Sequence, residues 1–183
     1  MNDLYKEIEL TDDDLDKALE YSKDRVYKRS MRGEEGTYVG AIGEIVLVDY
    51  LRDHNMEVID KRKSTRYDLL VNSKRVEVKT KDRTVEPKPF YDCSVPLYNH
   101  SHQIPDWFYF ISLYREGKVF KKAYLLGGMT YQQLEQEGVV MNEGELDERN
   151  GWLCRESCIN ITMDKLIPNS MMLEILNDTQ VHD

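Results

Sequence analysis

The chain has 183 residues, of which 40% are hydrophobic and 32% are charged, and its formal net charge is −9. This composition is typical of a folded domain with its own core, and it excludes an intrinsically disordered chain. No apolar run approaches the roughly 20 residues that span a bilayer, so we expect no membrane-spanning segment.

The pattern along the chain predicts helices first and a sheet afterwards. Thr11 with Asp14, and Thr130 with Gln133, resemble capping boxes. Gly40 and Gly43 indicate that the second helix packs closely against a neighbour. The predicted elements, in chain order, are helix 12–29, loop 30–36, helix 37–52, strands 56–60, 67–71 and 75–80, an irregular segment 81–105, strands 106–114 and 118–126, a short helix between Thr130 and Gly138, an acidic loop 139–151, strand 157–163 and helix 169–177. This order predicts an α/β (α+β) fold with a mixed central sheet flanked by helices.

We find no repeat, low-complexity segment or linker that would divide the chain, so we expect one domain over residues 1–183. Within it we expect an N-terminal helix and loop over 1–36, a core over 37–126 and a C-terminal α/β extension over 127–183. Residues 81–105 hold four of the five prolines, which is typical of a long functional or partner-facing segment.

The N-terminus and the cysteines favour the cytoplasm. The first residues, MNDLYKEIEL, are acidic and lack the apolar centre of a secretion signal. Three cysteines, Cys93, Cys154 and Cys158, are an odd and sparse set, which argues against a disulfide scaffold. We therefore expect a cytoplasmic protein.

A predicted hairpin over residues 66–80 has one charged face. A two-residue turn at Asn72-Ser73 would place Asp68 directly opposite Glu77, with Lys79 two residues further along the same face. Two carboxylates directly opposite one another are destabilising, and a bound cation would offset their repulsion. Mg²⁺ prefers one or two carboxylates together with water and substrate phosphate. The alternative is a solvated hairpin whose outer face is simply charged.

One acidic residue, Glu44, lies at the centre of the apolar helix 37–52. Ala41, Val48 and Leu51 share its face, so we expect its carboxylate to be at least partly buried. A buried charge needs a partner. The partner could be an arginine, or it could be the predicted metal site or its water.

Positive charge is concentrated around the hairpin in spite of the negative total. Residues 61–83 carry nine bases against three acids, and residues 21–32 add a further excess of four. A local basic surface can bind phosphate whatever the net charge of the protein, although a solvated charged face is the alternative. The predicted nucleic-acid contacts are Lys61, Arg62, Lys63, Arg66, Lys81, Arg83, Arg29 and Arg32.

Glu44 on a helix, then Asp68, then Glu77-Val78-Lys79 on a strand resembles the PD-(D/E)XK nuclease superfamily. This group includes many restriction endonucleases, phage exonucleases and junction resolvases, and the resemblance covers residues 37–114. It implies a restriction endonuclease-like core with Asp68 and Glu77 as metal ligands. It also implies that Lys79 is the catalytic lysine and that Glu44 is an auxiliary ligand of the metal or of water.

Two features depart from the pattern of that superfamily. The residue before Asp68 is Tyr67 rather than proline. The superfamily also has a second core helix after the strand of the catalytic lysine, whereas residues 81–105 do not read as a long helix.

The resemblance implies a Mg²⁺-dependent nuclease that hydrolyses DNA with a metal-activated water, and in which Mn²⁺ can replace Mg²⁺. It would act in a bacterium or a phage-infected cell, and a homodimer would suit the cutting of both strands. We expect no nucleotide cofactor, because the chain has neither a P-loop nor a G-x-G-x-x-G motif. Two alternatives stay open: a non-catalytic nucleic-acid-binding or assembly module with the same fold, and an RNA-directed nuclease.

The remaining candidate ligands have simpler interpretations. Cys154 and Cys158 have a C-x3-C spacing and lie far from Cys93, so we expect buried thiols rather than structural zinc. His100 and His102 are interpreted as solvated loop residues. Gln103 would point at the site if that loop folded back. The aromatic run 107–110 is interpreted as a core strand rather than as a base-stacking platform.

Overall fold

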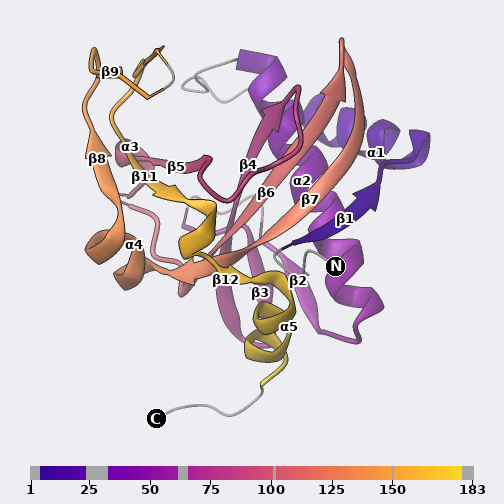
Figure 1. The fold of residues 1–183 in the computed structure, drawn as a ribbon. Helices are drawn as coiled ribbons and strands as arrows, with labels where there is room; N and C mark the ends of the chain where they lie inside the picture. Colours follow the sequence, from indigo (N-terminus) through magenta and orange to yellow (C-terminus); the bar gives the residue numbers. More distant parts are fainter. Residues whose placement is uncertain (1–4, 24–32, 62–65, 101, 150, 179–183) are drawn as a thin grey trace.

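The computed structural model describes residues 5–23, 33–61, 66–100, 102–149 and 151–178 (Figure 1). Its helices are α1 (Asp12–Lys23), α2 (Gly33–Asp53), α3 (Leu97–His100), α4 (Tyr131–Glu137), the 3₁₀ helix η1 (Met163–Lys165) and α5 (Asn169–Asn177). Its strands are β1 (Lys6–Glu9), β2 (Val58–Asp60), β3 (Leu69–Val71), β4 (Lys74–Arg83), β5 (Asp92–Pro96), β6 (Trp107–Glu116), β7 (Val119–Thr130), β8 (Val139–Met141), β9 (Leu146–Asp147), β10 (Trp152–Leu153), β11 (Cys158–Thr162) and β12 (Ile167–Pro168).

The main sheet is mixed, so the predicted α/β class is confirmed at this level. Its strand order is β1-β7-β6-β4-β3-β2, and β12 adds to β7. Strands β4 and β6 are parallel, whereas their other neighbours are antiparallel. Consequently β4 is an interior strand, with β3 on one side and β6 on the other.

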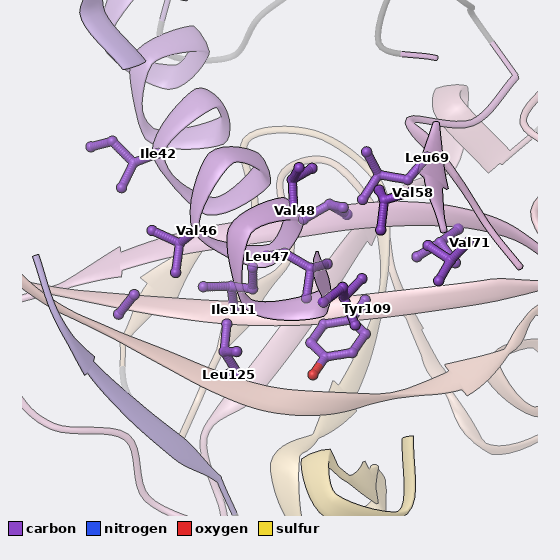
Figure 2. Close-up of a cluster of buried hydrophobic side chains, with 14 of the residues drawn as sticks. Ile42, Val46, Leu47, Val48, Val58, Leu69, Val71, Tyr109, Ile111 and Leu125 are labelled. Carbon is purple, nitrogen blue, oxygen red and sulfur yellow. The ribbon is translucent and has the colours of Figure 1, made fainter. Parts of the chain in front are cut away.

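The two faces of the main sheet are covered by different layers. In Figure 1, α1 and α2 lie beside β6 and β7, while the small sheet β5-β11-β8 lies on the opposite side. Figure 2 shows Val46 and Leu47 of α2 near Ile111 and Tyr109 of β6. Each fully buried side chain of this size contributes roughly 1.5–3 kcal/mol relative to exposure. This layer therefore holds α2 firmly against the sheet.

The second face packs against the small sheet. Phe108 and Phe110 of β6 and Leu126 of β7 join Val95 and Ile161 in a separate buried cluster. Because strand side chains alternate, β6 sends Tyr109 and Ile111 to one layer and its phenylalanines to the other. The aromatic run is thus a core strand, as the sequence predicted.

The predicted hairpin forms with the predicted turn. Asn72 and Ser73 both have positive φ, 43° and 69°, as a two-residue hairpin turn requires. Leu69 pairs with Val76, and the pairing continues through Leu70 and Val71. The regular pairing ends at Leu69, and the Asp68 N–H donates to the Val76 carbonyl over 3.1 Å, so the predicted pairing of Asp68 with Glu77 lies beyond the regular register.

Both predicted capping boxes are present. The Thr11 N–H donates to Asp14 Oδ2 over 2.8 Å, and the Asp14 N–H donates to Thr11 Oγ1 over 3.2 Å. Thr130 caps α4 in the same reciprocal way with Gln133. The predicted helix 169–177 is also confirmed without change.

Several predicted boundaries were wrong. Residues 33–36 belong to α2 rather than to a loop, whereas residues 24–32 lie outside the described part of the chain. The acidic loop 139–151 contains the short strands β8 and β9. Strand β7 continues through Gly127 to Thr130 because β12 and β6 pair with its glycines. Strand β1 was missed because its sequence, KEIE, carries a single apolar residue.

The described residues of segment 81–105 form no long helix, as the sequence indicated, but its first three residues belong to β4 rather than to an irregular segment. Its helix α3 spans four residues, and β5 pairs with β11 rather than with the main sheet. In the residues that the structure describes, no helix combines the length and the apolar character needed to cross a membrane.

Helix α2 approaches β4 closely at Gly43. A Cβ atom added there would overlap Thr80 Oγ1 and lie 3.0 Å from Thr80 Cβ. Gly40 has no such neighbour, because a Cβ added there would meet no heavy atom within 4 Å. The expectation of close packing is therefore confirmed for Gly43 and wrong for Gly40.

We predict opposite effects for alanine at these two glycines. Gly43→Ala should lower the free energy of unfolding by about 1–3 kcal/mol, because it overpacks the contact with Thr80. Gly40→Ala, the matched control, should leave stability unchanged or raise it by about 0.5–1 kcal/mol, because alanine favours the helix. Urea unfolding followed by circular dichroism measures both. Equal effects at the two positions would contradict the close contact.

Candidate active site

A cavity of about 700 Å³ lies between the main sheet and the elements that cover it. The residues that carry the predicted chemistry line one part of it: Glu44, Asp68, Glu77, Lys79, His102 and Gln103. They come from α2, from the start of the hairpin, from β4 and from the loop before β6. The fold thus brings together all four residues of the predicted catalytic set.

Glu77 and Lys79 form a buried ion pair. Lys79 Nζ lies 2.7 Å from Glu77 Oε1, and the Glu77 residue is 3% exposed. Gln103 completes this group: its Nε2 donates to Glu77 Oε1 over 2.6 Å, and its Oε1 accepts from Lys79 Nζ over 3.2 Å. The second carboxylate oxygen, Glu77 Oε2, is buried and has no hydrogen-bond partner among the described residues.

The loop that carries Gln103 folds back onto the hairpin. The Ile104 N–H donates to the Arg66 carbonyl over 3.1 Å, and the Asp106 N–H donates to the Arg75 carbonyl over 2.9 Å. The carboxylate of Asp106 also pairs with the Arg75 guanidinium at 2.5 Å. These contacts explain why Gln103 reaches the cavity. The sequence predicted this position only on the condition that the loop folds back.

Asp68 lies at the point where β3 and β4 separate. Its Oδ2 accepts the N–H of Val78 over 2.9 Å, and its own N–H donates to the Val76 carbonyl over 3.1 Å. Burial and the charges of Glu44 and Glu77 raise the pKa of Asp68 well above its usual value, against the lowering effects of Lys79 and the Val78 N–H. Three carboxylates therefore repel one another here.

Glu44 enters the cavity from α2. It follows Gly43, whose contact with Thr80 draws this turn of the helix against β4. The partly buried carboxylate that the sequence predicted is confirmed, because Glu44 is half-buried and lines the cavity. Its charge acts on Asp68, so the carboxylates of the helix and of the hairpin belong to one electrostatic group.

The predicted nucleic-acid contacts are only partly gathered around this site. Lys81 and Arg83 line the cavity, whereas Lys61 and Arg66 are exposed at the base of the hairpin. The other four lie outside the described residues: Arg29, Arg32, Arg62 and Lys63. Four further cavity residues were not singled out from the sequence: Ser94, Ser112, Trp152 and Arg155. Only Ser112 carries a signal, since it is a polar residue inside the apolar run FISLY.

The cysteines behave as buried thiols. Burial raises the pKa of Cys93 and of Cys158 to about 12. The Cys154 thiol donates to the carbonyl of Glu156 over 3.0 Å. All three side chains are buried and none forms a disulfide. Such thiols are poor nucleophiles, because the reactive thiolate is scarce at neutral pH.

The oxygen donors of the cavity fit a hard divalent cation. In the described ranges no three His, Cys, Asp or Glu side chains are grouped closely enough to form a ready-made ligand cluster. Mg²⁺ does not need one, since one or two carboxylates suffice when water and substrate phosphate supply the remaining ligands. The buried and unbonded Glu77 Oε2 and the raised pKa of Asp68 are both features that a cation would relieve.

No protein-family model, curated protein or solved structure matches this chain.

The neighbouring carboxylates of Glu44, Asp68 and Glu77 predict that the stability of the protein falls as pH rises. The pKa of Asp68 is raised on folding, so the folded state binds more protons than the unfolded state between the two pKa values. The free energy of unfolding should therefore fall as pH rises above about 4. Asp68→Asn should be more stable than wild type at pH 8 and should lose part of this slope.

Urea unfolding between pH 5 and pH 8 in EDTA measures this effect. The exposed Asp16 of α1 supplies the control Asp16→Asn, which should keep the wild-type slope. A slope that is identical in wild type and Asp68→Asn would show that the Asp68 carboxylate is not crowded.

Proposed function

We propose that this protein is a metal-dependent nuclease of the PD-(D/E)XK type that hydrolyses phosphodiester bonds in DNA. The observation that carries the proposal is that Glu44 of α2 and Asp68 before β3 line the same cavity as Glu77 and Lys79 of β4. An accidental match of a short sequence pattern gives no reason for its members to meet in space. The buried ion pair and the raised pKa of Asp68 are further support.

Lys79 is suited to stabilise negative charge on a phosphate. Glu77 Oε1 and Gln103 Oε1 hold its ammonium in place, so little reorganisation is needed when the substrate enters. Lys79 lies between the carboxylates and the cationic residues further along β4. An incoming phosphodiester would therefore meet its ammonium. Lys79 would therefore orient the phosphate and favour the charge that develops as the bond breaks.

The crowded carboxylates are suited to hold a divalent cation. Burial and the charges of Glu44 and Glu77 raise the pKa of Asp68, and a bound cation would offset this repulsion. Asp68, Glu77 and Glu44 would hold Mg²⁺ or Mn²⁺, which supplies charge neutralisation and Lewis-acid polarisation of the phosphate.

The local distribution of charge near the site suits DNA, although the net charge of the protein is negative. Lys61 and Arg66 are exposed at the base of the hairpin, while Lys81 and Arg83 continue the site along β4. Such bases contact the phosphate backbone and position the strand without reading its sequence. The acidic remainder of the surface would repel DNA and so direct it to this region.

We predict cleavage of DNA that depends on Mg²⁺ or Mn²⁺ and disappears in EDTA. Glu77→Gln and Lys79→Met should lower the rate by about 100-fold or more, because each removes a group that acts in the transition state. Gel analysis of supercoiled plasmid and of linear duplex measures nicking and degradation. The same assay on RNA tests the RNA-directed alternative.

Exposed residues of the same types serve as controls. Glu57→Gln and Lys118→Gln should cleave as fast as wild type, because both side chains are exposed and neither lines the cavity. Circular dichroism checks that each variant is folded, since removing one partner of a buried ion pair destabilises a protein. Unchanged cleavage by folded Glu77→Gln would refute the assignment. DNA binding without cleavage by wild type would favour the non-catalytic module.

We predict that the metal also stabilises the fold. At tenfold excess over its dissociation constant, Mg²⁺ should raise the melting temperature of wild type by about 3–6 °C. Asp68→Asn should lose most of this shift, while Asp16→Asn should keep it. Differential scanning fluorimetry over a Mg²⁺ titration, with Na⁺ matched for ionic strength, measures the effect. Equal shifts in the two variants would place the ion elsewhere.

A further inference from the structure

The cavity extends beyond the carboxylates along β4. Lys79, Lys81 and Arg83 alternate with residues of the opposite face and all line the cavity. Two residues along a strand span about 7 Å, so the three cations form a row with that spacing. This spacing resembles the separation of neighbouring phosphates along a nucleic-acid strand.

Lys81 and Arg83 of this row have no ion pair with a carboxylate in the described residues. Lys81 Nζ lies 5.9 Å from the ring centre of Trp152, and no ion pair of Lys81 or Arg83 occurs among the described residues. The surrounding protein and the charge of Arg83 lower the pKa of Lys81. Two neighbouring cations repel one another, and an anion bound there would remove that cost.

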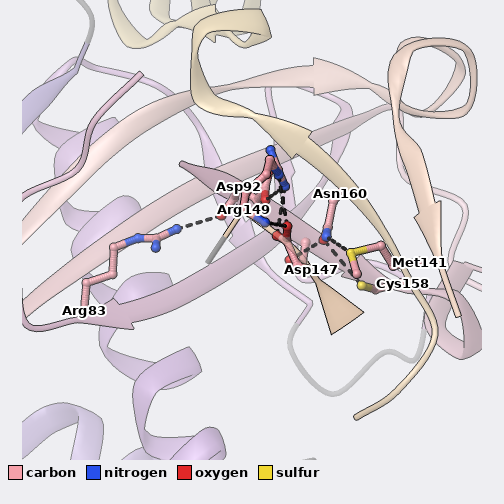
Figure 3. Close-up of polar contacts among 8 residues, drawn as sticks. Arg83, Asp92, Met141, Asp147, Arg149, Cys158 and Asn160 are labelled. Atoms are coloured by element: carbon pink, nitrogen blue, oxygen red, sulfur yellow. Dashed lines mark hydrogen bonds and ion pairs between the residues drawn. The ribbon is translucent and has the colours of Figure 1, made fainter. Parts of the chain in front are cut away.

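Arg83 is held by neutral groups. Its Nη2 donates to the carbonyl of Asp92 over 2.6 Å (Figure 3). Its guanidinium lies 5.0 Å from the ring centre of Tyr91. The Asp92 carboxylate is instead paired with Arg149 at 2.5 Å. Arg83 Nε is buried without a hydrogen-bond partner in the described part of the chain. The guanidinium is thus fixed in place without an ion pair to a carboxylate in the described residues.

Ser112 supplies an independent sign of a ligand. It pairs in register with Lys81 across β4 and β6, so both side chains face the cavity. Ser112 is 1% exposed, yet its Oγ has no hydrogen-bond partner among the described residues. A buried hydroxyl without a partner costs free energy, and a ligand oxygen beside Lys81 would satisfy it.

The acidic residues of this part of the cavity do not cancel its charge. Asp82 also lines it, but its carboxylate accepts from Arg115 Nε over 2.9 Å. Glu156 is matched in charge by its neighbour Arg155, which lines the same cavity. Lys81 and Arg83 therefore leave this end of the cavity positive, in contrast to the carboxylate end.

We propose that Lys81, Arg83 and Ser112 form a phosphate-binding subsite, which holds a phosphate of the substrate one or two nucleotides from the bond that is cut. The assignment of this ligand to a nucleic acid rests on the proposed function, whereas the anion site itself does not. The phosphate is either a terminal monoester or an internal diester. Buried Cys93, Cys158 and Met163 also line the cavity, and their apolar surface suits the end of a strand better than a continuous chain.

Binding in EDTA tests the subsite without cleavage. The probes are three fluorescein-labelled single strands of one sequence, with a 5′-phosphate, a 3′-phosphate or hydroxyls at both ends. Fluorescence anisotropy should show affinity about tenfold weaker for Lys81→Gln, and a salt dependence smaller by about 0.7 in log–log slope. Lys118→Gln, the charge-matched control, should bind like wild type.

Ser112→Ala separates a ligand role from a structural one. Because the Oγ has no partner to lose, the melting temperature should be unchanged or higher, while affinity should fall about threefold to tenfold. Arg83→Lys keeps the charge and should bind more weakly than wild type but more strongly than Arg83→Gln. Thermal unfolding of each variant shows whether a weaker affinity follows from loss of fold.

The three probes identify the source of the phosphate. A preference of wild type for one phosphorylated end, lost in Lys81→Gln, would assign the subsite to a terminal monoester. Equal weakening for all three probes would assign it to an internal diester. Wild-type affinity for every probe in both Lys81→Gln and Ser112→Ala would overturn the subsite, whatever the outcome of the cleavage assay. If the variants change binding as expected but wild type does not cleave DNA, the proposed nuclease activity is overturned and the anion subsite is kept.

Discussion

The constraint on which this structure depends is that β4 is an interior strand with charges on a covered face. Strand β6 pairs with β4 from Val76 to Arg83, β3 pairs with the first three residues of β4, and α2 covers the side that carries Val76 and Val78. The other side carries Glu77 and Lys79 beneath the small sheet β5-β11-β8. Charges in such a place must be paired or hydrated, since an isolated buried charge is very costly. The cavity exists because these side chains cannot be packed against apolar groups.

The charges along β4 are separated by sign. Carboxylates from α2, the hairpin and β4 gather at one end, where burial and mutual repulsion raise the pKa of Asp68. Lys81 and Arg83 occupy the other end, and Lys79 lies between them, paired with Glu77. The like charges at each end repel one another. A cation bound at the carboxylate end and an anion bound beside Lys81 and Arg83 would therefore both be stabilising. A divalent ion and a phosphate chain meet these two requirements together.

The support for the site comes from packing as much as from charge. Gly43 lets α2 approach Thr80, which sets Glu44 at the same cavity as the hairpin. The contacts of Arg66 and Arg75 with the loop before β6 bring Gln103 against Glu77 and Lys79. Preorganisation of this kind reduces the rearrangement that a substrate would have to induce. This group of charged residues is therefore supported from outside the sheet on two sides.

Local patterns determined the elements whose causes are local. The hairpin register, its Asn72-Ser73 turn and the capping box of Thr130 follow from alternation, positive φ and short-range hydrogen bonds, and each was predicted from the sequence. Strand β1 and the continuation of β7 through Gly127 could not be predicted, because they depend on partners far away in the chain.

For the site, the sequence by itself determined the residue types and their order: an acid inside an apolar helix, then an acid, an acid and a lysine on a hairpin. Only the tertiary structure decided that Glu44 meets the hairpin, that Gln103 joins Lys79 and that Ser112 faces the cavity unbonded. The physical reason is that alternation along a strand sets which face a side chain takes, whereas the layer that covers this face is supplied by residues remote in sequence.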